Sequence, residues 1–93
     1  MASKELQDFI AARQGLVWYV KDPRVLNEEA VVEAVLNYGQ WEDFKKLIHI
    51  LGIPRVAEIF RTHMRTSDRK AGNYYPEVRH YFTLYFDKYA PVA

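Results

Sequence analysis

Apolar residues recur along most of the chain at the three- and four-residue spacing of amphipathic helices. The spacing predicts five helices, at about residues 3–14, 27–38, 40–51, 54–65 and 76–89. The connections between the second, third and fourth of these are only a few residues long, so these helices must pack against their sequence neighbours. We therefore predict an all-α fold, a compact bundle of about five short helices that forms one domain over residues 1–93.

The expected helix ends carry suitable residue types. Ser3 and Asn27 can cap the first and second helices, because a side-chain oxygen accepts a hydrogen bond from an unpaired N–H group of the first turn. Gly39 and Gly52 are expected to end the second and third helices. Pro76 suits the first turn of the last helix, where a missing N–H group costs nothing.

Residues 16–26 do not follow the helical spacing. The run from Leu16 to Val20 is short, apolar and rich in residues that favour strands. The residue before Pro23 is pushed out of the helical region of backbone space. We expect a packed connector that is anchored by Trp18, with a short strand as the alternative.

The segment 73–89 is rich in aromatic residues, holding five of the seven tyrosines and two of the five phenylalanines. A stripe of Val78, Tyr81, Phe82 and Tyr85 is expected to close the core. The aromatic residues left over are of the types enriched at interface hot spots, and tyrosine can lie half in water. The residues expected to bind a partner are Tyr74, Tyr75, Leu84, Phe86 and Trp18. The partner is another protein or, alternatively, a second copy of the chain in a homodimer.

Composition narrows the functional classes. Hydrophobic residues make up 49% of the chain and charged residues 27%, which is typical of a globular protein. A formal net charge of +1 gives no overall attraction to nucleic acid or to an anionic membrane, and the absence of cysteine excludes disulfides and thiolate metal sites. The first residues lack the apolar core of a signal peptide, and no apolar run approaches the ~20 residues of a membrane span. We expect a cytoplasmic protein.

Little in the sequence indicates catalysis. His63 shares a face with apolar residues, which suits either a buried acid or base or, more commonly, a core histidine with a satisfied hydrogen bond. His49 and His80 lie opposite the apolar faces of their helices and are expected to be solvated. The acidic pairs at 28–29 and 42–43 are helix neighbours that point about 100° apart, so they do not form facing dyads. We predict no enzyme activity, no catalytic residue, no metal and no cofactor.

A nucleic-acid-binding alternative comes from the basic second half of the chain. The third and fourth helices, with the turn at Gly52, can be drawn as a helix-turn-helix over residues 41–65. Clustered cations are what phosphate contacts require. The residues expected to make such contacts are Arg55, Arg61, Arg65, Arg69, Lys70 and Arg79. Glu58 interrupts this face, and an ordinary solvated face is the competing interpretation.

Several segments together resemble a small bacterial and archaeal domain family of unknown function. An apolar segment with a tryptophan precedes Asp22-Pro23. A helix then ends in the Val-Leu-Asn-Tyr-Gly pattern of 35–39. Trp41 begins the next helix and is followed by two acidic residues. The basic segment 65–71 and the pair Tyr85-Phe86 stand where that family closes with a basic segment and an aromatic pair.

Members of that family are often encoded beside AbiEii-type nucleotidyltransferase toxins. The resemblance therefore implies an antitoxin-like protein-interaction module that binds and neutralises a nucleotidyltransferase-type toxin. The alternative is a DNA-binding transcriptional autorepressor that uses the helix-turn-helix over residues 41–65. The family pattern contains no catalytic residues, so the resemblance assigns none to this chain.

Overall fold

The computed structural model describes residues 3–66 and 73–91, and within these it contains five α-helices, two 3₁₀ turns and no strand. The helices are α1 (Lys4–Ala11), α2 (Glu28–Tyr38), α3 (Trp41–Leu51), α4 (Ile53–Thr66) and α6 (Pro76–Tyr89), and the 3₁₀ turns are η1 (Gln14–Val17) and η2 (Pro23–Val25). The all-α fold predicted from the sequence is confirmed. None of these helices is long and apolar enough to cross a membrane.

Local signals set where the helices begin and end. Ser3 Oγ accepts an N–H group of the first turn of α1 at 3.2 Å, and Asn27 Oδ1 does the same for α2 at 2.9 Å. Gly52 separates α3 from α4 with a φ of +87°, a left-handed value that glycine adopts without a steric penalty. That single residue therefore allows α4 to begin directly after α3.

Asp43 links the first helix to the third. One oxygen of its carboxylate accepts the N–H of Gln40 at 2.8 Å, just before α3 begins. The other oxygen accepts a hydrogen bond from Arg13 Nε, also at 2.8 Å. The same side chain thus satisfies a backbone group at the start of α3 and ties α3 to the residues that follow α1.

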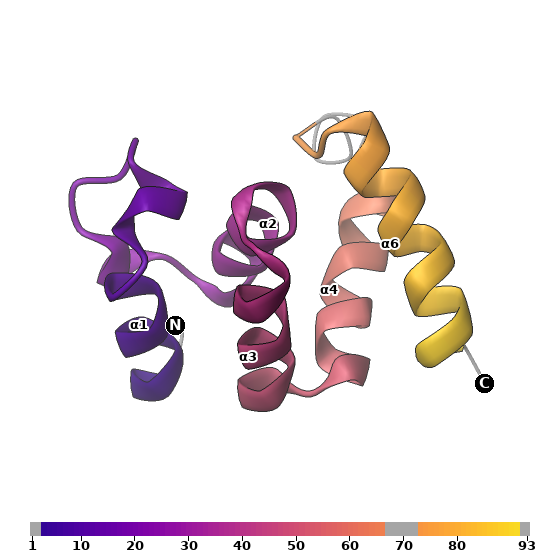
Figure 1. Ribbon diagram of the computed structural model, residues 1–93, viewed down its shortest axis with the longest axis horizontal. Coiled ribbons are helices and arrows are strands. Elements are labelled where there is room, and N and C mark those ends of the chain that lie inside the picture. Colours follow the sequence, from indigo (N-terminus) through magenta and orange to yellow (C-terminus); the bar gives the residue numbers. More distant parts are fainter. Residues whose placement is uncertain (1–2, 67–72, 92–93) are drawn as a thin grey trace.

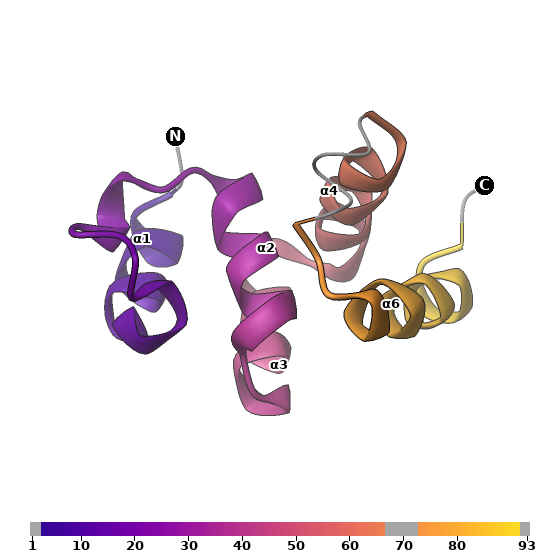
Figure 2. The same cartoon turned by 90° about the horizontal axis from the view of Figure 1, so that it is seen from above.

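The elements are arranged in sequence order across the molecule. α1 and the two 3₁₀ turns lie at one end, α2 and α3 in the middle, and α4 and α6 at the other end (Figures 1 and 2). α2 contacts η1, α3 and α4, and it is accordingly buried on more than one side. Its buried residues are Val31, Val32, Ala34, Val35 and Leu36.

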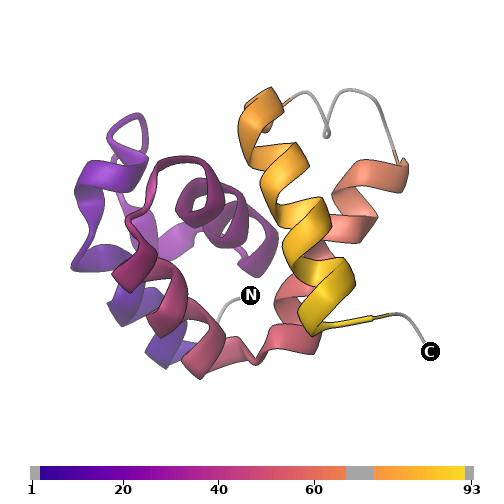
Figure 3. The same cartoon turned by 45° about the vertical axis from the view of Figure 1, so that its right-hand side comes forward.

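Phenylalanine side chains hold α6 against the rest of the fold. The helix lies beside α4 (Figure 3). Phe82 and Phe86 lie one turn apart on α6, facing Phe44 of α3 and Phe60 of α4. Ring centroids are 5.0 Å apart for Phe44 and Phe82, and 5.5 Å apart for Phe60 and Phe86. Arg61 adds a hydrogen bond from its guanidinium to the carbonyl oxygen of Phe86 at 2.9 Å. We call the four phenylalanines the phenylalanine cluster.

The first part of the chain differs from the prediction. α1 ends at Ala11 and not at Gln14, because Arg13 leaves the helical region of backbone space on its way to Asp43. In the connector at 16–26, the expected anchor Trp18 was wrong, since this side chain is 63% exposed and Val17 is buried instead. A 3₁₀ turn presents only one side of this short run to the core, and Val17 occupies that side.

The inner face of α6 is also rotated relative to the prediction. Phe82 and Phe86 are four residues apart, so they share one line along the helix, and both are buried. Tyr81, which was expected on the core-closing stripe, points about 100° away from Phe82 and is exposed. On α6 the buried rings are those without a hydroxyl, whereas Tyr85 lies half-buried at the edge of the core.

The phenylalanine cluster predicts a large effect for Phe60→Ala. Phe60 is buried and contacts Phe86 of α6 and the ring of Tyr74. Truncating a buried phenylalanine costs about 3–5 kcal/mol, a large part of the total stability of a domain this small. We expect urea denaturation followed by circular dichroism to show a loss in this range. The control Leu84→Ala changes an exposed residue of α6 and should alter stability by less than about 0.5 kcal/mol. Equal losses in the two variants would contradict this role for Phe60.

Candidate protein-interaction surface

Four aromatic side chains from three separate parts of the sequence meet at the surface, and we call them the aromatic cluster: Trp18, Tyr19, Tyr38 and Tyr75. Trp18 and Tyr19 follow η1, Tyr38 ends α2, and Tyr75 immediately precedes α6. The ring centroid of Tyr38 is 4.9 Å from that of Trp18 and 5.7 Å from that of Tyr75, with nearly perpendicular ring planes in both pairs. Tyr19 is 59% exposed and Tyr75 50% exposed. Large rings therefore contact one another and the solvent at the same time.

Asn37 fixes the position of Tyr75 relative to α2. The Nδ2 atom of Asn37 donates a hydrogen bond to the carbonyl oxygen of Asn73 at 2.9 Å, and its Oδ1 atom accepts the N–H of Tyr75 at 3.1 Å. One amide side chain thus satisfies two backbone groups of the segment that leads into α6. Because Tyr38 is the next residue of α2, these bonds also bring its ring against that of Tyr75.

Tyr74 anchors the same segment from the inside. Its side chain is 2% exposed, and its hydroxyl oxygen lies 2.7 Å from Nδ1 of His63, which is also buried. Burial and, secondarily, the negative charge of Glu33 raise the pKa of Tyr74. The burial of His63 that the sequence predicts is confirmed. Tyr74 therefore holds the backbone in place while its neighbour Tyr75 faces the solvent.

Folding disfavours the charged form of two hydroxyl groups in the aromatic cluster, those of Tyr38 and Tyr19. A hydrogen bond with Tyr75 and, after it, burial raise the pKa of Tyr38 above its ordinary value. Burial and then the charge of Glu33 raise the pKa of Tyr19. Tyr38 and Tyr19 therefore present neutral hydroxyl groups beside apolar rings. This combination is typical of the central part of protein–protein interfaces, where charged residues are depleted.

The structure separates the five residues expected to bind a partner. Trp18 and Tyr75 lie together in the aromatic cluster, and Leu84 is exposed at 58% on α6, outside the cluster. For Tyr74 and Phe86 the prediction was wrong, because both side chains are buried. Tyr74 is buried since its hydroxyl finds a partner in His63, and Phe86 is buried since it shares the inner line of α6 with Phe82.

A second group of exposed aromatic residues runs along α6. Tyr81 and Tyr89 are largely exposed, and Tyr85 lies between them, with its ring centroid 4.7 Å from that of Tyr89. Trp41 at the start of α3 packs against Tyr85 with centroids 5.9 Å apart. These residues frame the phenylalanine cluster and supply a matched set of aromatic side chains outside the aromatic cluster.

The cations expected to contact phosphate are partly engaged within the chain. Arg55 makes hydrogen-bonded ion pairs with Glu28 and Glu58, each at 2.6 Å, and the bond with Glu28 raises the pKa of Arg55. Arg61 bonds the carbonyl oxygen of Phe86. Arg65 is exposed and Arg79 half-buried, while Arg69 and Lys70 lie outside the described residues. DNA binding by residues 41–65 stays a prediction, and two of its expected cations already have partners.

The described residues assemble no metal site, because no three histidine, aspartate or glutamate side chains gather closely enough to hold an ion. His49 and His80 are exposed, as the sequence predicts.

No protein-family model, no curated protein and no solved structure matches this chain. These comparisons therefore assign no family and no function to the chain.

The buried hydroxyl of Tyr74 predicts a loss of stability in alkali. Because folding raises the pKa of Tyr74, its contribution is fully present below about pH 10 and is lost as the pH rises above that value. We expect the free energy of unfolding to fall by up to about 1.4 kcal/mol per pH unit from this group, and to fall less steeply in Tyr74→Phe. Urea denaturation at several pH values measures the slopes.

Tyr81→Phe is the matched control for this comparison. It removes an exposed hydroxyl from α6 and leaves the buried hydroxyl of Tyr74 in place, so its slope should stay steeper than that of Tyr74→Phe. Identical slopes in all three proteins would show that the hydroxyl of Tyr74 is not buried in solution.

Proposed function

We propose that this chain is a protein-interaction module that binds and neutralises a nucleotidyltransferase-type toxin through its aromatic cluster. The observation that carries the proposal is the contact of Trp18, Tyr38 and Tyr75 at the surface with the outer two rings half or more exposed. The type of partner comes from the resemblance of the segments at 16–23, 35–43 and 85–86 to the toxin-associated family.

Exposed rings of this size favour association. An aromatic side chain carries about 150–250 Å² of surface, so covering a half-exposed ring contributes roughly 2–3 kcal/mol at 25 cal/mol per Å². Tryptophan and tyrosine are also the residues most often found as hot spots. Covering Trp18 and Tyr75 therefore contributes a binding free energy that is large for such a small surface.

The cluster is held in place before a partner arrives. Asn37 bonds the backbone on both sides of Tyr74, and Tyr74 itself is locked in the core. Val17 anchors the turn that precedes Trp18. A surface whose side chains are already ordered loses less conformational entropy on binding, which favours higher affinity.

The double variant Trp18→Ala/Tyr75→Ala tests the proposal. We expect its dissociation constant for a purified nucleotidyltransferase-type toxin to rise by at least about 30-fold, since a hot-spot truncation costs 2 kcal/mol or more. Isothermal titration calorimetry measures the constant, and rescue of growth in cells that express the toxin measures neutralisation. Circular dichroism should show an unchanged fold, because both side chains lie largely in solvent.

Trp41→Ala/Tyr81→Ala is the matched control, since it removes the same two residue types at similar exposure outside the aromatic cluster. We expect it to keep most of the affinity. Equal losses in the two double variants would remove the aromatic cluster as the binding site. Failure of the wild-type chain to bind the toxin at micromolar concentrations would remove the toxin as the partner.

A homodimer through the same surface is distinguished by sedimentation velocity at several concentrations of the chain alone. A concentration-dependent dimer that Trp18→Ala/Tyr75→Ala abolishes would assign the aromatic cluster to self-association and would contradict binding to a toxin through free rings. A monomer at all concentrations leaves the rings exposed for another protein.

A further inference from the structure

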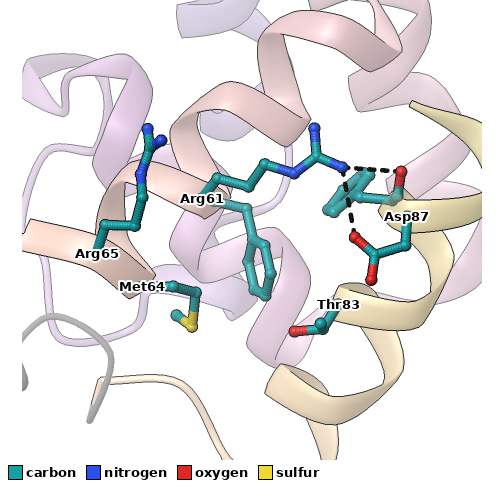
Figure 4. A pocket seen from close by; sticks show the side chains of 7 residues that line it. Arg61, Met64, Arg65, Thr83 and Asp87 are labelled. Carbon is teal, nitrogen blue, oxygen red and sulfur yellow. Dashed lines mark hydrogen bonds and ion pairs between the residues drawn. The ribbon is translucent and has the colours of Figure 1, made fainter. Parts of the chain in front are cut away.

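A pocket of about 270 Å³ opens between α4 and α6, on the α4 side of α6 (Figure 4). It shares no residue with the aromatic cluster. The lining residues are Phe60, Arg61, Met64, Arg65, Thr83, Phe86 and Asp87. α4 supplies the first four of these and α6 the last three, so the pocket is created by the way the two helices pack.

The floor of the pocket is apolar and well defined. Phe60 and Phe86 are each 1% exposed, and their rings contact each other inside the phenylalanine cluster. Met64 is half-buried beside them and supplies a flexible, polarisable wall. Pockets that take whole small-molecule ligands usually measure roughly 300–1,000 Å³. This pocket is smaller, so its size suits one bulky apolar side chain.

The charges around the pocket are unequal. Arg61 reaches across to α6, where it bonds the carbonyl oxygen of Phe86 and lies 3.7 Å from the carboxylate of Asp87 (Figure 4). The charge of Asp87 is thereby offset. Arg65 stands one turn further along α4, exposed, and forms no ion pair with any residue that the structure describes. Among the described residues, the charge at the pocket without an ion-pair partner is therefore the guanidinium of Arg65, a group that pairs well with a carboxylate.

Thr83 adds a polar group at the α6 wall. Its hydroxyl donates a hydrogen bond to the carbonyl oxygen of Arg79 at 2.6 Å. The lone pairs of that hydroxyl are left to accept a hydrogen bond from a backbone N–H group of a bound peptide. An apolar floor, one hydrogen-bond acceptor and the exposed guanidinium of Arg65 together match a peptide segment that carries an apolar side chain and a carboxylate.

We propose that this pocket is a peptide-binding site, which takes a phenylalanine or leucine side chain from an acidic segment of another protein and pairs an adjacent carboxylate with Arg65. The side chain rests on Phe60 and Phe86, and the segment crosses the rim between Arg65 and Thr83. The site is independent of the aromatic cluster, and it does not require that the chain bind a toxin.

The test uses two blocked tetrapeptides and the full chain. The acidic probe is acetyl-Glu-Phe-Asp-Glu amide, and the neutral probe is acetyl-Gln-Phe-Asn-Gln amide. NMR titration should shift the methyl signals of Met64 and Thr83, with a dissociation constant on the order of 1 mM for the acidic probe. The neutral probe should bind about two- to five-fold more weakly, which is the effect expected of one exposed ion pair.

Two variants and one control variant locate the site. Arg65→Gln should abolish the preference for the acidic probe, whereas Arg24→Gln, which changes an exposed arginine near α1, should retain it. Thr83→Phe should fill the pocket and eliminate the shift of the Met64 methyl. Because Thr83 is exposed, this variant is expected to fold.

Three results would overturn the proposal: no shift at Met64 with about 10 mM acidic probe, equal affinity for both probes, or binding that Thr83→Phe leaves intact. The variant Trp18→Ala/Tyr75→Ala should bind the acidic probe as the wild-type chain does. If it loses that binding, the peptide occupies the aromatic cluster and the pocket is not its site. Failure of toxin binding would leave these titrations unaffected, so the two proposals fail separately.

Discussion

The packing of Phe44, Phe60, Phe82 and Phe86 is the interaction on which both surface sites depend. These rings set where α6 lies; α6 lines the pocket, and Tyr75 of the aromatic cluster immediately precedes it. Tyr75, which contacts Tyr38, leads directly into α6, and two of the four rings, Phe60 and Phe86, line the pocket. Protein interiors are packed as densely as organic crystals, so rings that interdigitate define one position for the helix. The surface chemistry is thus a consequence of the core.

Much of the fold is predictable from local signals. Asn27, Gly39, Gly52 and Pro76 mark helix ends that the structure reproduces within a residue or two, because capping and backbone geometry depend on near neighbours. The buried faces of α6 and of the segment at 16–20 were harder to predict. Apolar spacing alone does not say which of several aromatic residues lies innermost, since tyrosine and tryptophan are stable both inside and at the surface.

The candidate site was predictable only in part. Trp18 and Tyr75 could be suspected individually, but their contact through Tyr38 could not, because it depends on the long-range bonds of Asn37. The sign of this contact in the sequence was Asn37, a polar residue next to Tyr38 in the last turn of α2. The pairing of Arg55 with Glu28 was likewise hidden, since the partner lies on another helix. Tyr74 is buried because its hydroxyl contacts His63, and no sequence pattern predicts that contact.

The two hydrogen bonds of Asn37 make the aromatic cluster a property of the native state alone. Residues 18, 38 and 75 are far apart in the sequence, so no interaction holds them together in an unfolded chain. A partner that recognises all three rings therefore distinguishes folded from unfolded molecules. Such a partner also acts back on the fold by thermodynamic linkage: at a hundred times its dissociation constant it adds about 2.7 kcal/mol to the free energy of unfolding. The docking of α6 and the binding of the partner are then thermodynamically coupled, so that each favours the other.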